Sequence, residues 1–155
     1  MIIWHEKNNC LRFVRSVARM IVYKTKTKKL GGTSYREVIK KARAIFHNIE
    51  KRSKRNAYLR SAYFKKEKVF FGMFWTHLNQ KPKKNRVRRL KLLSCAVDLI
   101  EHSRNKPISK LNPNNTKELL HRFGGITSEG ELFYVQIKEN LRTKRKDFMS
   151  VFPAE

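Results

Sequence analysis

Hydrophobic residues recur along the chain with two different periods, and the change between them falls near residue 105. Before it, apolar positions lie three or four residues apart, which predicts amphipathic helices. After it, apolar and polar positions alternate, which predicts strands. Helices followed by an antiparallel meander indicate an α+β fold. We expect N-terminal helices packed on one face of a C-terminal antiparallel β-meander sheet, with the other face open to a ligand.

The clearest helix is predicted over residues 34–51. Ser34 and Glu37 form a capping box, and apolar residues follow at helical spacing. The segments 69–78 and 84–103 are predicted as further helices, the first of them only toward its C-terminal end. In the tail, three strands are predicted over residues 117–124, 131–138 and 147–152, after a turn-rich run at 106–115.

The first 32 residues are expected to form a separate part of the chain. Residues 11–22 are amphipathic with arginines on the polar side, a pattern that suits a membrane surface, a partner groove or ordinary packing. The run 24–32 has the composition of a flexible basic linker. Met20 is an alternative start of translation, which would remove that helix. The predicted division is therefore 1–32, helix and linker, and 33–155, a single domain.

The net charge of the chain indicates what kind of partner it binds. The formal net charge is +25, and residues 51–91 hold 15 Lys and Arg against one acid, Glu67. A compact chain this basic repels itself, so a polyanion is the expected partner, and aromatic residues among the cations favour single-stranded RNA. The candidate RNA-binding residues are Arg52, Lys54, Arg55, Arg60, Lys84, Arg86, Arg88, Arg89, Lys91, Arg142 and Lys144.

Cysteine usage and hydropathy suggest a location. Cys10 and Cys95 lie in no recognisable motif, which fits a reducing, cytoplasmic environment, although a disulfide between them stays open. No apolar run reaches the roughly 18 residues of a membrane span, so no stable membrane insertion is expected. No secretory signal pattern is present. No histidine, cysteine or acid cluster suggests a metal or another cofactor, so none is expected.

The tail 126–153 resembles the closing hairpin of the barnase/EndoU/colicin/RelE-like ribonuclease superfamily, whose phage- or toxin-associated members end in an antiparallel sheet. The resemblance lies in Gly130, in the strand Phe133-Tyr134-Val135, in Ser150 and in Phe152-Pro153. The hydroxyl residue of the last strand is commonly Thr in these families and is Ser here. The order of helices and then strands extends the resemblance loosely over most of the chain.

This resemblance implies a toxin-like or mobile-element-associated endoribonuclease that needs no metal. The ribose 2′-OH would attack the adjacent phosphorus and leave a 2′,3′-cyclic phosphate, which requires a base, an acid and cations. The implied partners are RNA (tRNA, mRNA or the ribosome) and an acidic antitoxin or immunity protein. The candidate catalytic residues are His77, Lys138, Ser150, Tyr134, His121 and Arg122, supported by Gln136 and Arg89.

Two other readings of the sequence remain open. A non-catalytic RNA- or DNA-binding module would use the same charge and would not need the polar residues of the predicted sheet. An inactive relative could instead use its basic amphipathic start to bind a membrane or a protein. Cleavage of RNA separates the first reading from an enzyme, and removal of residues 1–30 tests the second.

Overall fold

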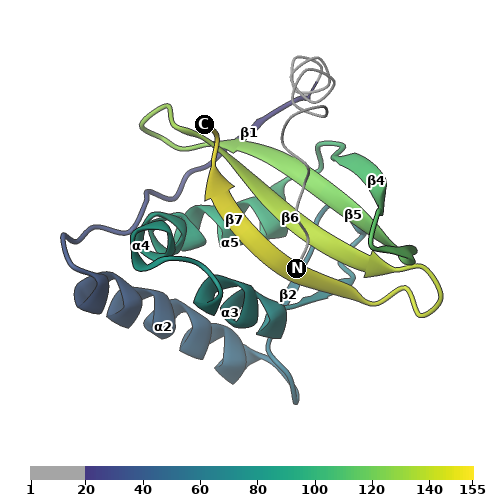
Figure 1. Cartoon of the computed structure of the whole chain (residues 1–155), viewed down its shortest axis with the longest axis horizontal. Helices are drawn as coiled ribbons and strands as arrows, with labels where there is room; N and C mark the ends of the chain where they lie inside the picture. Colours follow the sequence, from purple (N-terminus) through teal and green to yellow (C-terminus); the bar gives the residue numbers. More distant parts are fainter. Residues whose placement is uncertain (1–19) are drawn as a thin grey trace.

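The computed structural model describes residues 20–155 (Figure 1). Four helices are found in this range: α2 Tyr35–Arg52, α3 Gly72–Asn79, α4 Lys83–Lys91 and α5 Leu93–His102. Seven strands accompany them: β1 Tyr23–Lys24, β2 Tyr58–Arg60, β3 Lys68–Phe70, β4 Ile108–Asn112, β5 Asn115–Ile126, β6 Leu132–Asn140 and β7 Lys146–Pro153. The protein is therefore α+β, as predicted.

All seven strands belong to one sheet, in the order β1-β5-β6-β7-β3-β2 with β4 also paired to β5. The three predicted strands of the tail correspond to β5, β6 and β7, which form an antiparallel meander. The prediction of a purely antiparallel sheet is wrong, because β1 pairs parallel with β5 and β3 pairs parallel with β7. The helices are also not all N-terminal to the strands, since α3, α4 and α5 lie between β3 and β4.

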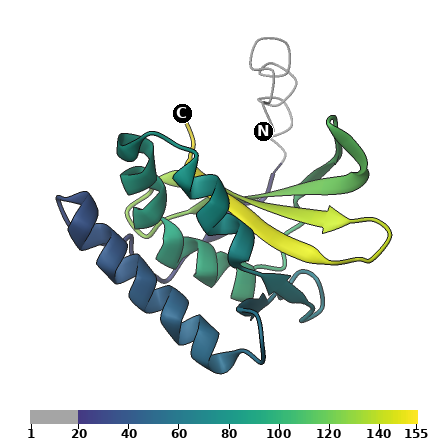
Figure 2. The same ribbon diagram turned by 60° about the horizontal axis from the view of Figure 1, so that its bottom comes forward.

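The helices gather on one side of the sheet in two views of the molecule (Figures 1 and 2). We call the face toward them the inner face. There Val135 and Phe148 join Phe74 of α3 and Leu99 of α5 in one buried apolar cluster. Phe74 and Phe148 stack with ring centroids 5.1 Å apart. The opposite, outer face carries Arg122, Tyr134, Gln136, Lys138, Ser150 and Phe152.

The helix predicted over residues 34–51 is confirmed as α2, and its start follows the predicted logic. The Ser34 hydroxyl accepts a hydrogen bond from the Glu37 amide at 3.2 Å. The Glu37 carboxylate accepts one from the Thr33 amide, one residue before the position expected in a capping box. Val38 and Ala42 lie on the buried stripe, so the apolar spacing correctly identified the packed side.

The segment 84–103 forms two helices rather than the predicted one. The break falls at Leu92, whose amide bonds the Arg89 carbonyl, a tightened turn at the end of α4. Leu92 is fully buried. The apolar spacing runs through the break because both helices turn their leucines to the same core, and so spacing alone could not reveal it.

The predicted linker at 24–32 is tied into the fold. The Thr25 amide bonds the Ile126 carbonyl, the Lys28 carbonyl accepts the Ser94 hydroxyl, and the Leu30 amide bonds the Lys91 carbonyl. Basic composition resembled a linker, but the backbone supplies these bonds whatever the side chains are. The described fold therefore shows no break at residue 32.

Other expectations fall at the edges of the described range. The helix predicted over 11–22 lies mostly outside residues 20–155. The turn-rich run 106–115 contains β4, which turns at Asn112–Asn115 into β5. Among the described residues, no helix combines the length and the apolar character that a membrane crossing requires.

Candidate functional site

Three neighbouring strands place polar side chains in a row on the outer face. Arg122 of β5 lies opposite Gln136 of β6, which in turn lies opposite Ser150 of β7. Arg122 Nη2 donates a hydrogen bond to Gln136 Oε1 at 3.0 Å. Gln136 is buried, whereas Arg122 and Ser150 are half-buried. Gln136 therefore orients its neighbours, and these neighbours are the groups that a bound molecule can reach.

Two arginines from different elements meet at one aromatic ring of the same face. The guanidinium carbons of Arg89 and Arg122 lie 5.4 Å and 5.1 Å from the centre of the Phe152 ring. Arg122 also lies over Tyr134, at 5.9 Å. Cations over ring faces are held by the ring quadrupole. Through this contact the Arg89 side chain of α4 reaches the outer face of the sheet.

The electrostatics of this group suit an anionic ligand. Burial lowers the pKa of Arg122 to about 10, which still leaves it charged at neutral pH. Burial also lowers the pKa of Arg89, where Glu155 opposes the effect and Arg88 adds to it. Burial raises the pKa of Tyr134 despite the nearby Arg122, so the phenol keeps its proton. Two cations and a proton donor thus share one face. We call this set the outer-face group; it consists of Arg89, Arg122, Tyr134, Gln136, Lys138, Ser150 and Phe152.

His77 lies in the last turn of α3 and is half-buried. Burial lowers its pKa from 6.5, and the positive charges of Lys81, Lys138 and Arg89 lower it further. Its imidazole is therefore neutral at pH 7. Within the described part of the chain, no residue is hydrogen-bonded to either ring nitrogen of His77. The ring is therefore able to accept a proton, and the positive charges of Lys138 and Arg89, two residues of the outer-face group, act on it.

Lys138 extends the outer face toward the β4–β5 end. Its ammonium lies 3.2 Å from the Glu118 carboxylate, and both side chains are largely buried, at 18% and 16% exposure. Glu118 also accepts a hydrogen bond from Asn112 at 3.0 Å. Lys138 is therefore held in one position and is partly neutralised, which makes it a positioned charge rather than a mobile one.

His121, the sixth catalytic candidate, is not brought to the others. It lies on the inner face, where its Nδ1 is 2.7 Å from the Ser109 hydroxyl and its Nε2 is 2.9 Å from Glu139. Glu139 is also 3.5 Å from the Lys146 ammonium. The Phe64 ring packs against the imidazole, with centroids 5.1 Å apart. Both ring nitrogens of His121 are thus engaged within a buried network.

The basic residues predicted on α4 have different positions. Arg86 donates to the carbonyls of Lys81 and Asn79 at 2.7 and 2.9 Å, so it caps the end of α3. Arg88 pairs with Glu155 at 2.8 Å. Arg89 belongs to the outer-face group. Lys84 is exposed and Lys91 is half-buried.

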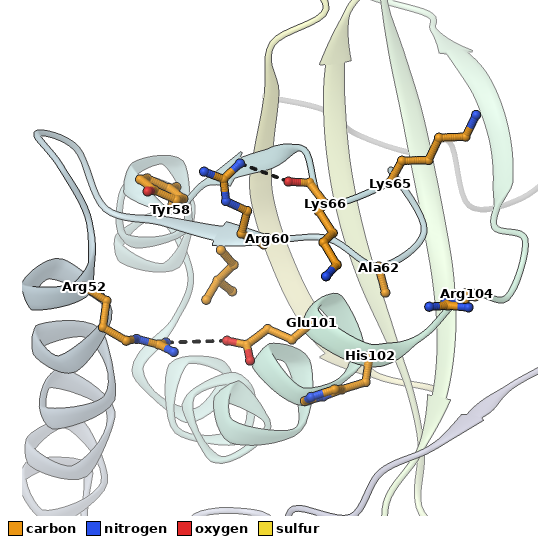
Figure 3. A pocket seen from close by; sticks show the side chains of 10 residues that line it. Arg52, Tyr58, Arg60, Ala62, Lys65, Lys66, Glu101, His102 and Arg104 are labelled. Atoms are coloured by element: carbon orange, nitrogen blue, oxygen red, sulfur yellow. Dashed lines mark hydrogen bonds and ion pairs between the residues drawn. The ribbon is translucent and has the colours of Figure 1, made fainter.

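Several other predicted RNA-binding residues line two open pockets beside the β2–β3 hairpin, the larger of which is drawn in Figure 3. The larger has a volume of about 1140 Å³, and its cations are Arg52, Arg60, Lys65, Lys66 and Arg104. The smaller, of about 640 Å³, has Arg60, Lys68, Lys144 and Arg145. Arg60 lines both. Lys54, Arg55 and Arg142 are exposed and line neither pocket.

The sequence reading missed a paired histidine in the larger pocket. His102 Nδ1 is 2.9 Å from the Asp98 carboxylate. That carboxylate also accepts bonds from the Tyr23 hydroxyl and from the Lys26 and Thr27 amides. Burial alone would raise the pKa of Asp98, but these donors hold it below its usual value. The spacing of Asp and His by four residues on a helix was the available signal.

Comparison of the chain with protein-family models, with curated proteins and with solved structures finds no match. What supports a function is therefore the charge, burial and geometry of the described residues themselves. Within residues 20–155, no group of three or more His, Cys, Asp and Glu side chains is placed to hold a metal ion. The candidate site is thus the outer-face group with His77, and none of these residues lines either basic pocket.

Proposed function

We propose that the protein is an RNA-binding endoribonuclease that cleaves by metal-independent transphosphorylation and leaves 2′,3′-cyclic phosphate ends. The observation that carries the proposal is His77, a half-buried imidazole whose pKa is lowered by burial and by the positive charges of Lys81, Lys138 and Arg89. A neutral imidazole can remove a hydroxyl proton at pH 7. The adjacent cations favour a phosphate at the same place and stabilise the charge that develops on it.

In the proposed reaction, His77 takes the proton of the ribose 2′-OH while the bond from O2′ to phosphorus forms. The bond from phosphorus to O5′ breaks, and the leaving oxygen takes a proton from the Tyr134 phenol. Arg122, which lies over the Tyr134 ring, favours the phenolate that results. Lys138 and Arg89 face the phosphate, while Ser150 and Gln136 orient the sugar. The proton on His77 then returns to solvent, and the Tyr134 phenolate takes a proton from solvent, so both residues regain their starting states.

This proposal agrees with the resemblance of the tail to the barnase/EndoU/colicin/RelE-like ribonuclease superfamily. The meander of β5, β6 and β7 has the helices on one side and the polar row on the other. The substrate class is RNA: tRNA, mRNA or the ribosome. A basic protein of this kind would be neutralised by an acidic antitoxin or immunity protein, whose carboxylates would compete with phosphate.

Incubation of the purified full chain with tRNA, mRNA and ribosomes in EDTA tests the proposal. We expect fragments that carry 2′,3′-cyclic phosphate ends, and their loss in His77→Gln. Absence of cleavage from all three substrates would show that the protein is not this kind of enzyme.

The basic pockets favour a second candidate, a non-catalytic module that binds RNA or DNA. Their cations do not belong to the outer-face group and serve binding alone equally well. Such a module would bind with a steep dependence on salt concentration and would give no product. The same EDTA assay, run beside a binding measurement, separates the two functions.

A further inference from the structure

The two basic pockets beside the β2–β3 hairpin form one surface, because both are lined by Arg60. We call this surface the hairpin groove. It is built from β2, β3, the loop between them, the end of α5 and the β6–β7 loop. None of its lining residues belongs to the outer-face group. Phe70 of the groove pairs with Asp147, which pairs with Lys138, so the groove adjoins the outer-face group at Lys138. A ligand in the groove would nevertheless contact other residues than those of the candidate catalytic site.

The charge in the groove is strongly positive. The acidic residues that line it are Glu101 and Glu67. Each is already paired, Glu101 with Arg52 at 3.5 Å and Glu67 with the buried Lys146. Arg60 is fixed across the groove, since it donates to the Lys66 carbonyl at 3.1 Å (Figure 3). The remaining cations face an open space that suits a chain of phosphates.

Two aromatic rings lie among these cations. Tyr58 and Phe70 are cross-strand partners on β2 and β3, with centroids 6.3 Å apart. Arg60 and Lys68 lie over the Tyr58 ring at 5.3 and 4.7 Å. Arg145 lies over the Phe70 ring at 4.1 Å. Rings and guanidinium planes at this spacing are the surfaces on which unpaired bases stack.

Three lysines of the groove have a left-handed backbone, a conformation that Arg55, outside both pockets, also takes. Lys65, Lys66 and Lys144 have φ angles of 53°, 65° and 63°. This left-handed region favours glycine or asparagine, and a lysine there strains the turn. All three lysines line the groove. The turns thus carry positive charge at positions where a smaller, uncharged residue would fold more easily.

We propose that the hairpin groove binds single-stranded RNA next to the candidate catalytic site, through residues that are not part of that site. Phosphates lie against Arg60, Lys65, Lys66 and Arg104, and bases stack on the rings of Tyr58 and Phe70. Single-stranded RNA fits better than a duplex, because the bases of a duplex are already stacked on one another. It also fits better than an acidic protein, because carboxylates would pair with the cations but would not stack on the rings of Tyr58 and Phe70. The choice of RNA rests on the proposed function, but binding in the groove does not depend on cleavage.

The double variant Lys65→Gly/Lys66→Gly tests the groove without risk to the fold. Glycine relieves the left-handed backbone and keeps the Lys66 carbonyl that Arg60 uses. The probe is a 2′-O-methyl oligouridine of about twelve nucleotides, which cannot undergo transphosphorylation. We expect affinity to fall about tenfold, and the slope of log K against log salt to lessen by about 1.4 for two lost phosphate contacts. Arg36→Ala/Lys40→Ala, on the exposed side of α2, removes the same charge and should change affinity less than about twofold.

A second variant, Tyr58→Leu, separates stacking from charge. Loss of a stacked base should weaken binding of the same probe about tenfold while leaving the salt slope unchanged. Unchanged affinity in both groove variants overturns the proposal. An unchanged Tyr58→Leu together with equal competition by polyglutamate also overturns it, and assigns the groove to an acidic protein.

Cleavage of a dinucleotide places the groove relative to the active site. A dinucleotide is too short to occupy both surfaces, so Lys65→Gly/Lys66→Gly should cleave it at the parent rate. If its cleavage falls along with oligouridine binding, the groove is itself the active site and the proposal of a separate surface is wrong. If the parent cleaves no RNA but its groove variants still lose oligouridine binding, the enzyme function fails and the groove assignment stands.

Discussion

His77 and His121 lie in two polar regions that differ in hydrogen bonding and in the sign of the nearby charges. His121 is on the inner face, 6% exposed, with Ser109 and Glu139 on its two ring nitrogens. His77 is on the side of the outer face, half-buried, and has no hydrogen-bonded partner for its ring among residues 20–155. The Glu139 carboxylate lies 2.9 Å from the His121 ring. By contrast, positive charges act on the His77 ring and, together with burial, lower its pKa.

This difference indicates which histidine is available for proton transfer. A buried polar group must be satisfied or the fold loses stability, so the His121 network stabilises the sheet and would have to break in order to react. The His77 ring has no such network among residues 20–155, and it is neutral at pH 7 and partly exposed. His121 therefore has a structural environment, whereas His77 is the histidine that the proposed function uses, and each of the following predictions tests that contrast.

The largest expected effect is on catalysis at His77. His77→Gln keeps a polar side chain of similar size but cannot transfer a proton, so RNA cleavage should fall by about 10²- to 10⁴-fold. The free energy of unfolding should stay within about 0.5 kcal/mol of the parent value. His47→Gln, at a side chain 65% exposed on α2, is the matched control and should change neither quantity. A His77→Gln variant with full activity would remove the basis of the contrast.

The next effect is on stability at Glu139. Glu139→Ala leaves His121 Nε2 without a partner and weakens the pairing of Lys146, whose side chain is 5% exposed. Loss of one partner from a buried ion pair costs about 3 kcal/mol. Urea denaturation should therefore show that loss, while Glu50→Ala, at a side chain 51% exposed, should show almost none. Equal stability of the two variants would mean that the His121 network does not support the sheet.

The Glu139 effect should also depend on pH. Burial alone would raise the pKa of Glu139, but the hydrogen bond from His121 and the charge of Lys146 hold it below 4.5. A carboxyl whose pKa is lower in the folded state stabilises the fold above its unfolded pKa, and that contribution is lost as the pH falls through the folded pKa. Glu139→Gln should therefore lose less stability than the parent does when both are acidified below pH 4.5.

A smaller effect is expected at Ser109, the exposed end of the same network. Ser109→Ala removes the hydroxyl 2.7 Å from His121 Nδ1 and should lower the free energy of unfolding by about 1 kcal/mol. Ser128→Ala, at an exposed turn, serves as the control with no expected change. If Ser109→Ala instead abolished RNA cleavage at unchanged stability, His121 and not His77 would belong to the reactive region.

The smallest effect is a shift in the pH profile of cleavage. After burial, Lys81 is the largest cause of the lowered pKa of His77. Lys81→Gln should raise that pKa toward 6.5, so the acid limb of the rate profile moves to higher pH while the plateau rate is unchanged. The His77 ring resonances in an NMR titration should move in the same direction. Lys40→Gln is the control, and identical profiles for both variants would contradict the role given to Lys81.

The sequence predicted what depends on local pattern. The capping pair Ser34 and Glu37 located α2, and strict alternation around Val135 located the meander and its two faces. It also placed Tyr134, Gln136 and Lys138 together, because alternate residues of a strand share a face. These predictions needed only neighbours along the chain.

What the sequence did not predict depends on distant partners. β1, β2 and β3 have two or three residues each, too few to show a period. They exist because β5 pairs with β1, β7 pairs with β3, and β3 pairs with β2. His121 alternates with Arg122, so its opposite face followed from the pattern, but its engagement by Ser109 and Glu139 depended on the turn at β4. The groove at Arg60 was predicted only as charge, since its walls come from separate parts of the chain.

The position of β7 in the sheet has a consequence for the living cell. β7 lies between β6 and β3, so the middle of the sheet is missing until residue 153 has left the ribosome. Until then Ser150 and Phe152 cannot reach the outer face, and β3 has no parallel neighbour. This strand order delays completion of the candidate site until translation has passed the last strand. Under the proposed function, the chain would then be unable to cleave its own message while it is being synthesised.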